Sequence, residues 1–288
     1  MRIGFVFILS AGLFLQACNS QKTSAGSDSA ATQYTGEGYR LVWSDEFNHP
    51  GRPDSSKWNY EQGFVRNEEF QWYQPENARC EKGVLVIEAR REERPNPGYS
   101  ADAKDWRGKR PSVAYTSSCL ITSGKAQWQY GRFEMRGRID ISDGLWPAWW
   151  TLGMDKPWPA NGEIDIMEYY RKMLLANIVC LGRQGRQEWH SNTFSTDSLG
   201  GKAWANKFHV WRMDWTEKHI ALYIDDQLLN KVPTDSLLNK DGSGFNPFKQ
   251  PHYMLLNLAI GGQNGGNPEN TSFPRRFEVD WVRVYQKL

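Results

Sequence analysis

The sequence has little net charge and no long block of one sign. Its 35 Lys and Arg residues nearly balance 33 Asp and Glu residues, which leaves a formal charge of +2 over 288 residues. The densest charged stretch, residues 88–94, mixes both signs. Binding to nucleic acid or to a membrane surface by charge needs a patch of one sign. Charge therefore indicates neither partner, and we expect no nucleic acid to bind.

Helical periodicity and internal repeats are also missing. No stretch keeps a 3.6-residue period over three turns, whereas residues 132–139 alternate charged and apolar side chains, as a strand does with one face on a core. Turn residues separate further apolar, β-branched or aromatic runs. The pattern predicts an all-β protein, an antiparallel β-sandwich in one domain over residues 39–288. The further runs are residues 84–89, 220–224, 254–260 and 277–285.

The N-terminal apolar run, residues 3–15, is too short to span a bilayer. It follows the basic residue Arg2 and ends shortly before Cys18, an arrangement similar to a bacterial lipoprotein signal. We therefore predict a lipoprotein signal peptide over residues 1–17 and a flexible tether over residues 18–38. A lipid on Cys18 would anchor the exported protein to a bacterial membrane, facing the periplasm or at the cell surface. The alternative is an ordinary signal peptide followed by a chance cysteine.

Cysteine is scarce, with four residues in the whole chain. Beyond Cys18, three remain: Cys80, Cys119 and Cys180. An odd number cannot pair completely, so at most one disulfide forms and one thiol stays free. The sequence leaves the pairing open.

Acidic residues, in contrast, are concentrated at one place: Glu163, Asp165 and Glu168 interrupt an otherwise apolar, strand-like run. Successive side chains of a strand alternate faces, so Glu163 and Asp165 share one face. Strict alternation would put Glu168 on the opposite, apolar face. A β-bulge at about Met167 would add one residue and return Glu168 to the acidic face. The alternative is three surface acids on a solvated strand.

Three carboxyls on one open face fit the cleavage of a glycosidic bond. Retaining glycosidases hold two carboxyls about 5–5.5 Å apart, one to attack the anomeric carbon and one to protonate the leaving oxygen and then activate water. Glu163 and Glu168, leaning together on a concave sheet, would approach this separation. Asp165 between them can hydrogen-bond a neighbour and, by like-charge repulsion, help to keep a proton on one of the three.

The acidic segment resembles the bulged E-x-D-x-x-E motif of glycoside hydrolase family 16. Four further blocks resemble the family in the expected order, so the resemblance extends over about residues 40–286. They are residues 41–47 (LVWSDEF, its first strand), 67–73 (NEEFQWY, the N-E-x-Q-Y stretch of its laminarinase-like members), 144–150 (GLWPAWW, its G-x-W-P-A-x-W segment) and 279–285 (VDWVRVY, its last strand).

This resemblance implies a β-jelly-roll with a concave cleft and endo-acting, retaining cleavage of a β-linked polysaccharide without a catalytic cofactor. It implies that Glu163 is the nucleophile, Glu168 the general acid/base and Asp165 the assisting carboxylate. The bulged motif is typical of β-1,3-glucanases, agarases, carrageenases and endo-β-galactosidases in the family. Plant xyloglucan-active members and bacterial lichenases usually lack the bulge.

Aromatic residues are abundant, with 14 Trp among 288 residues. Sugar rings stack their CH faces on aromatic rings, so a glycan cleft needs exposed aromatics. By the resemblance, Trp146 lies at the cleft and Asn67 binds sugar on the non-reducing side of the cleaved bond. For Trp150 and Trp158 the cleft and the core are alternatives. For Arg132 the two alternatives are substrate binding and a structural salt bridge.

The resemblance also implies a structural calcium ion on the convex side of the fold. The matching positions are Glu46, Asp280 and the backbone carbonyl of Gly83, which offer oxygen ligands. The alternative is that the two acids make surface hydrogen bonds.

One segment departs from the family pattern. Laminarinase-like members continue after the catalytic strand with an H-T-P-G-like stretch, which is absent at residues 171–180. Trp189 and His190 are candidates to replace it. The departure leaves open a β-1,3-glucan, which the Asn67 block favours, and a galactose-containing glycan of host mucin or algal origin. A catalytically inactive carbohydrate-binding protein, which commonly lacks one glutamate, is the third alternative; we expect a monomer.

Overall fold

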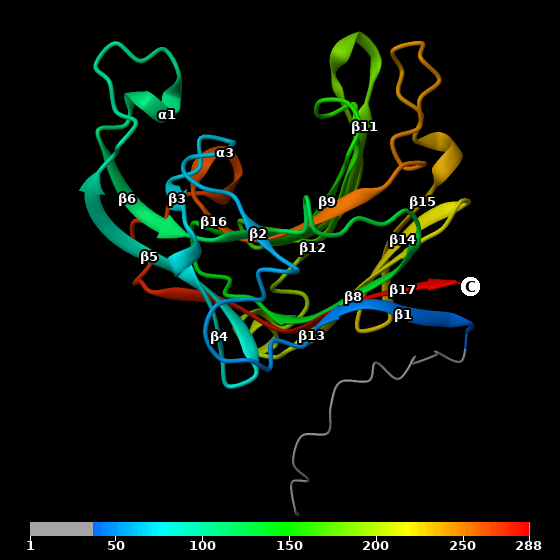
Figure 1. Ribbon diagram of the computed structural model, residues 1–288, viewed down its shortest axis with the longest axis horizontal. Helices are drawn as coiled ribbons and strands as arrows, with labels where there is room; N and C mark the ends of the chain where they lie inside the picture. Colours follow the sequence, from blue (N-terminus) through cyan, green and yellow to red (C-terminus); the bar gives the residue numbers. More distant parts are fainter. Residues whose placement is uncertain (1–36, 288) are drawn as a thin grey trace, which may run out of the picture. The chain divides into compact units, whose positions relative to one another are not determined.

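The computed structural model describes residues 37–287. The predicted signal peptide, Cys18 and nearly all of the predicted tether lie outside these residues. The described residues form one compact unit built from two β-sheets (Figure 1). Within residues 37–287, no helix has the length and apolar content needed to cross a membrane.

The larger sheet has ten strands in the order β15-β14-β13-β8-β17-β5-β6-β3, with β1 paired to β17 and β4 to β5. All its pairs are antiparallel except β3 with β6, which is parallel. Its strands are β1 (Tyr39–Asp45), β3 (Gln71–Tyr73), β4 (Ala78–Glu81), β5 (Val84–Pro95), β6 (Ser112–Ser117), β8 (Gly131–Arg138), β13 (His209–Trp215), β14 (His219–Ile224), β15 (Gln227–Pro233) and β17 (Arg275–Lys287).

The smaller sheet has seven antiparallel strands in the order β12-β11-β10-β9-β16-β7-β2. Its strands are β2 (Asn59–Tyr60), β7 (Cys119–Ile121), β9 (Leu145–Gly153), β10 (Glu163–Tyr170), β11 (Met173–Leu181), β12 (Gln187–Ser195) and β16 (His252–Ile260). The helices are short: α1 (Trp106–Lys109), α2 (Gly201–Ala205), α3 (Gly262–Gly265) and the 3₁₀ turns η1 (Pro75–Asn77), η2 (Arg183–Gly185) and η3 (Thr234–Ser236).

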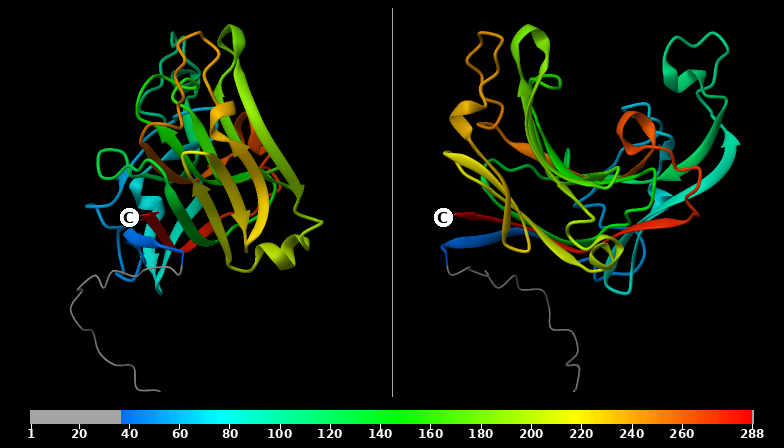
Figure 2. Two further views of the ribbon diagram at one scale, coloured as in Figure 1. Left: turned by 90° about the vertical axis from the view of Figure 1, so that its right-hand side faces the viewer. Right: turned by 180° about the vertical axis from the view of Figure 1, so that it is seen from behind.

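The predicted all-β, antiparallel sandwich is confirmed. The strand-like runs fall within observed strands β5, β14, β16 and β17, and the run at residues 132–139 coincides with β8 except for its last residue. In β8, buried and half-buried residues alternate along all eight positions, because one face packs on the core. Figure 2 shows the two sheets as curved layers, with the segment around α1 and the β11–β12 connection rising beside the outer face of the smaller sheet.

The core lies between the two sheets and uses aromatic side chains heavily. Four tryptophans, among them Trp149 and Trp211, are essentially inaccessible to solvent. Burying a large apolar side chain contributes about 1.5–3 kcal/mol, so part of the tryptophan excess stabilises the fold rather than the cleft. Cys80, Cys119 and Cys180 are buried on strands with free thiols, so these three residues form no disulfide with one another.

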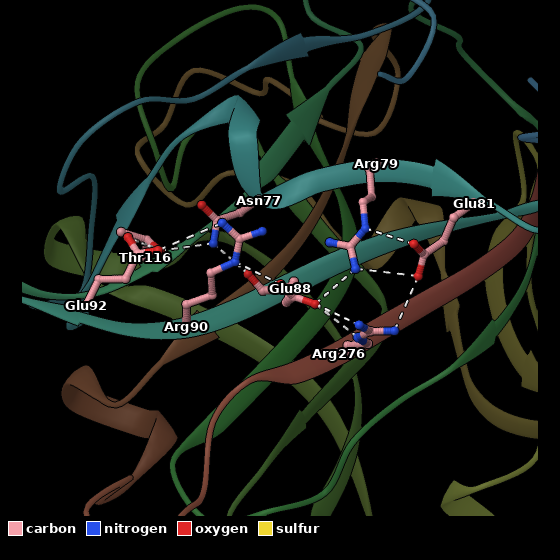
Figure 3. Close-up of polar contacts among 8 residues, drawn as sticks. All are labelled: Asn77, Arg79, Glu81, Glu88, Arg90, Glu92, Thr116 and Arg276. Atoms are coloured by element: carbon pink, nitrogen blue, oxygen red, sulfur yellow. Dashed lines mark hydrogen bonds and ion pairs between the residues drawn. The ribbon is translucent and has the colours of Figure 1, made fainter. Parts of the chain in front are cut away.

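A charged network ties three strands of the larger sheet together (Figure 3). Glu88 of β5 accepts hydrogen bonds from Arg79 of β4 at 3.0 Å, Arg90 of β5 at 2.8 Å and Arg276 of β17 at 3.0 Å. Burial acts to raise the pKa of Glu88, but the hydrogen bonds from Arg79 and Arg90 outweigh it and the pKa lies below its ordinary value. Glu88 therefore stays ionised and links β4, β5 and β17.

Candidate active site

The acidic strand β10 contains the bulge that the sequence predicts. Against β9 the register shifts between Asp165 and Met167, and against β11 between Asp165 and Glu168. At this point β10 has one residue more than either neighbour. Ile166 and Met167 are both fully buried in the core, so the chain turns Glu168 back to the face of Asp165. The predicted bulge at about Met167 is confirmed.

The three carboxyls line one cleft of 740 Å³ on the outer face of the smaller sheet. Asp165 and Glu168 are nearly buried, with 4% and 9% of their surface exposed, while Glu163 is half-buried. The cleft extends across β16, β9, β10, β11 and β12. Its lining also includes Arg66, Asn67, Glu69, Trp146, Ala148, Trp150, Leu152, Trp158, Tyr170, Leu175, Asn177, Gln187, Trp189, Ser191, Thr193, Asn257, Gln263 and Asn264.

Each glutamate accepts a hydrogen bond from a different indole. Trp158 donates its Nε1–H to Oε2 of Glu163 at 2.9 Å. Trp146 donates its Nε1–H to Oε1 of Glu168 at 2.8 Å, and Asn177 of β11 donates to the other oxygen of Glu168 at 2.9 Å. Hydrogen bonds to an ionised carboxylate stabilise it and fix its direction. The side chains of the two glutamates are thus held separately.

Burial raises the pKa of Glu163 and of Glu168 to about 7, and it raises the pKa of Asp165 as well. For Glu163, the Trp158 indole, the positive charge of Arg66 and a hydrogen bond with Asp165 act against burial. For Glu168, the charge of Glu163 adds to the effect of burial. The charge of Arg66 therefore favours the ionised form of Glu163, and the charge of Glu163 favours the protonated form of Glu168. A retaining glycosidase needs this division of roles.

The floor of the cleft on the β9 side is a polar and aromatic layer. The guanidinium of Arg66 lies 5.1 Å from the centre of the Trp150 ring and forms an ion pair with Glu61. Trp150 donates its indole N–H to Asn257 of β16 at 2.7 Å. These contacts hold an arginine and an indole together within the cleft wall.

The loop before β3 places Asn67 on the β9 side of the cleft. Asn67 adopts a positive φ of 53°, and its carbonyl accepts a hydrogen bond from the backbone N–H of Gln263 at 2.9 Å. Gly262 packs so closely that a Cβ there would lie 2.6 Å from the Asn67 carbonyl oxygen. Glycine at this position therefore permits the approach of α3 to the Asn67 loop.

The structure brings together most of the predicted binding residues. Asn67, Trp146, Trp150 and Trp158 all line the cleft with the three acids. Trp158 is 44% exposed, whereas Trp146 and Trp150 are 6% and 7% exposed. Of the two tryptophans that the sequence left between cleft and core, Trp158 lies in the cleft. Trp150 lines the cleft wall but also packs in a buried hydrophobic cluster, so it belongs to both.

Arg132 and His190 lie outside the cleft lining, and the structure corrects both predictions. Arg132 is on β8 of the larger sheet, where its Nε donates to Asp214 at 2.7 Å. It therefore has the salt-bridge role that the sequence left as the alternative. His190 is on β12, but the cleft-facing residues of that strand are its odd-numbered neighbours from Gln187 to Thr193. A strand presents alternate residues to one face, so His190 points away from the site.

The calcium prediction does not fit the structure. Glu46 accepts two hydrogen bonds from Arg283, at 2.9 and 2.7 Å, and Asp280 forms an ion pair with Arg136. Calcium requires six to eight oxygen ligands, whereas here each of the two carboxylates forms an ion pair with an arginine. Within residues 37–287, no three or more His, Cys, Asp or Glu side chains gather as a metal site. The structure thus gives Glu46 and Asp280 arginine partners and does not confirm the predicted calcium site.

Several cleft residues were missed by sequence reasoning. The cleft lining includes Arg66, Asn177 and Asn257, which the sequence did not predict to bind substrate. It also includes Trp189, which the sequence named as a candidate together with His190. Asn177 and Asn257 are the polar residues within apolar strands, a signal that could have indicated them. Arg66 directly precedes Asn67, but its direction depends on the loop conformation, which the sequence does not reveal.

This geometry agrees with comparisons to known proteins. The sequence model of the glycosyl hydrolases family 16 matches residues 67–283. The chain belongs to glycoside hydrolase family 16. Family membership and the relatives below make it an endo-acting glycoside hydrolase.

Three members of the comparisons show which proteins this chain is similar to. The beta-glucanase of Rhodothermus marinus is 38% identical over 272 residues, which cover 86% of this chain and 85% of that protein. The solved laminarinase of R. marinus is 36% identical, with a TM-score of 0.70 and coverage of 87% and 98%. A structure from work on endo-acting O-glycanases with which human gut bacteria initiate mucin breakdown is 32% identical, with a TM-score of 0.80 and coverage of 88% and 92%.

Proposed function

We propose that this family 16 enzyme is a retaining endo-β-1,3-glucanase. The observation that carries the proposal is the bulge in β10, which places Glu163, Asp165 and Glu168 on one face of a cleft that also holds the Asn67 loop. The 38% identity to a beta-glucanase over most of both chains supports the choice of a glucan.

The proposed reaction is a double displacement. The Glu163 carboxylate attacks the anomeric carbon while Glu168 donates its proton to the departing glycosidic oxygen. A glycosyl ester on Glu163 results. Glu168, now ionised, removes a proton from water, whose oxygen attacks the anomeric carbon and releases Glu163. Asp165 shares a proton with Glu163, so it assists the departure of the nucleophile in the second step.

A galactose-containing glycan is the second candidate substrate. The O-glycanase structure has a TM-score of 0.80 against 0.70 for the R. marinus laminarinase, although its sequence identity is lower. The likeness in backbone suggests similar walls around the cleft, and those walls select the sugar.

A substrate panel tests the proposal and separates the candidates. The purified protein is incubated with laminarin, mixed-linkage glucan, agarose, porphyran and mucin O-glycans, and the products are sized. We expect laminarin to yield oligosaccharides whose new reducing ends first appear in the β configuration by NMR. Cleavage confined to galactans would favour the second candidate, and binding without cleavage would indicate an inactive carbohydrate-binding protein.

The matched variant is Glu163→Gln, which keeps the size and hydrogen-bonding capacity of the side chain but removes the nucleophile. Turnover should fall by about 10⁴-fold or more while glycan binding and folding persist. Full activity in this variant would exclude Glu163 as the nucleophile.

We also propose that the enzyme is exported and carries a lipid on Cys18. The sequence of residues 1–18 supports this proposal. Radiolabelled fatty acid should enter the wild-type protein in a bacterial host and not the Cys18→Ser variant, which should be recovered in the soluble fraction instead of the membrane fraction.

A further inference from the structure

The outermost strand of the smaller sheet, β12, presents an exposed tryptophan to the cleft. Trp189 is 42% exposed and lines the same cleft as the three acids. The opposite face of β12 is occupied, since Asn192 donates a hydrogen bond to the carbonyl of Leu229 in β15. Edge strands usually carry charged or small residues that discourage association, so a large indole here calls for a functional explanation.

Strand register places this indole in line with the nucleophile. Glu163 pairs with Val179 of β11, and Val179 pairs with Trp189 of β12. Directly paired residues share a face of the sheet, so Trp189 projects to the same side as Glu163. Two strand spacings separate them, which is about 10 Å. A glycan chain that crosses the strands at Glu163 therefore passes over Trp189.

The surroundings of Trp189 suit a sugar ring. Its indole N–H donates to Oε1 of Gln187 at 3.1 Å, which orients the ring and leaves its face open to the cleft. The hydroxyls of Ser191 and Thr193 follow on the same face of β12 and line the same cleft. An aromatic face flanked by an amide and two hydroxyls matches a pyranose, which has an apolar CH face and a polar rim.

The position of β12 in the sheet assigns this site to one side of the cleaved bond. Asn67 and Arg66 lie on the β9 and β16 side of the acids, and Arg66 stacks on Trp150 of β9. The family resemblance implies that Asn67 binds the non-reducing side. β12 lies beyond β10 and β11 in the other direction, so it faces the leaving-group side.

We propose that Trp189 is a sugar-binding platform on the leaving-group side, where it stacks on a pyranose ring of the departing part of the glycan. The proposal rests on the proposed function, because it assumes a glycan that crosses β10 at the acids. Trp189 follows the segment whose sequence differs from the family pattern. The proposal gives this region a role in binding the sugars of the leaving group.

The test compares Trp189→Ala and Trp189→Phe with the wild type on oligosaccharides of increasing length from the glycan that the wild type cleaves, labelled at the reducing end. For Trp189→Ala we expect kcat/KM to fall about tenfold on the longest oligosaccharides, mostly through KM, and to change less than twofold on the shortest one cleaved. The preferred bond should move toward the reducing end. Trp189→Phe, which keeps an aromatic face, should recover most of the loss.

His190→Ala is the matched control, since it lies on the same strand with its side chain on the other face, and it should keep the wild-type cleavage pattern. Equal kcat/KM for Trp189→Ala and the wild type at all lengths would overturn the proposal, as would an equal loss at all lengths. Calorimetric binding of laminarin and galactan oligosaccharides to Glu163→Gln and Glu163→Gln/Trp189→Ala provides a readout without turnover. Weaker binding by the double variant supports the platform even if the proposed reaction fails, and equal binding contradicts it.

Discussion

At the scale of single residues, neighbouring side chains give Glu163 and Glu168 different electrostatic surroundings. Glu163 has an indole donor from Trp158 and a nearby cation in Arg66. Glu168 has an indole donor from Trp146 but faces the negative charge of Glu163. Burial raises the pKa of both glutamates alike, so these contacts are what distinguish the proposed nucleophile from the proposed acid.

This division predicts opposite effects of two similar substitutions. Each indole hydrogen bond lowers the pKa of its glutamate, so removing it raises that pKa. In Trp158→Phe the acid limb of the kcat/KM profile, set by ionisation of Glu163, should move up by about one pH unit. In Trp146→Phe the alkaline limb, set by Glu168, should move up instead. Measured pH profiles in which both variants move the same limb would contradict the assignment.

At the scale of the element, the bulge reconciles a packed core with a charged face. If the same residues paired with β9 and β11 without a bulge, β10 would alternate strictly and Glu168 would point into the core. With it, Ile166 and Met167 both enter the core, and the ladder with β9 and β11 resumes at Glu168. In this sequence the bulge therefore decides whether Glu168, the proposed acid/base group, faces the cleft.

Changing the number of residues in the bulge tests this reasoning. Deleting Met167 leaves Glu163, Asp165 and Glu168 in strict alternation, so all three still face the cleft. We expect this variant to fold and keep measurable activity, at a loss of about 2–4 kcal/mol in the free energy of unfolding because a buried side chain is gone.

The comparison variant inserts one Ala after Ile166. It should lose activity by about 10²–10⁴-fold, because strict alternation then places Glu168 on the cleft face but about 6–7 Å further along the strand from Asp165. Thermal unfolding and kcat/KM on the same preparations separate folding from catalysis. A deletion variant less active than the insertion variant would refute the role of the bulge in directing Glu168.

At the scale of the whole molecule, the active site costs stability. Three carboxyls lie in a cleft whose walls bury them, whereas the buried Glu88 of the larger sheet is matched with arginines. The folded-state pKa of Glu168, about 7, exceeds the ordinary value of about 4.3 in an unfolded chain. Stability from this group is present below the unfolded pKa and is lost as the pH rises through 7.

Glu168→Gln should remove that loss, because the amide stays neutral at every pH. The buried Oδ1 of Asn177, which has no hydrogen-bond partner, is available to accept from the new amide after a rotation of the Asn177 side chain. We expect the variant to gain on the order of 2 kcal/mol over the wild type at pH 8 and little at pH 5. Thermal unfolding at both pH values measures this gain, and an equal gain at both would contradict the assigned pKa.

Much of this protein follows from local sequence. Alternation predicted β8, and apolar, β-branched or aromatic runs between turn residues predicted β5, β14, β16 and β17, because these local patterns do not depend on distant residues. The acidic strand and its bulge were also predictable, since an acid at the wrong position of an apolar strand must either be buried at a high cost or be turned outward. Together these features indicated the sandwich, the three carboxyls and the family.

Pairing across the sheets decided the rest. The sequence left open whether Trp189 or His190 faces the cleft, because alternation says that they differ but not which one points outward; the register of β12 on β11 chooses Trp189. Glu46 and Asp280 offered oxygens for a metal, and strands distant in sequence brought them arginines instead. The sequence by itself determined the acids, the bulge and the strands. The tertiary structure decided which side chains face them, because that choice depends on neighbours brought together by folding.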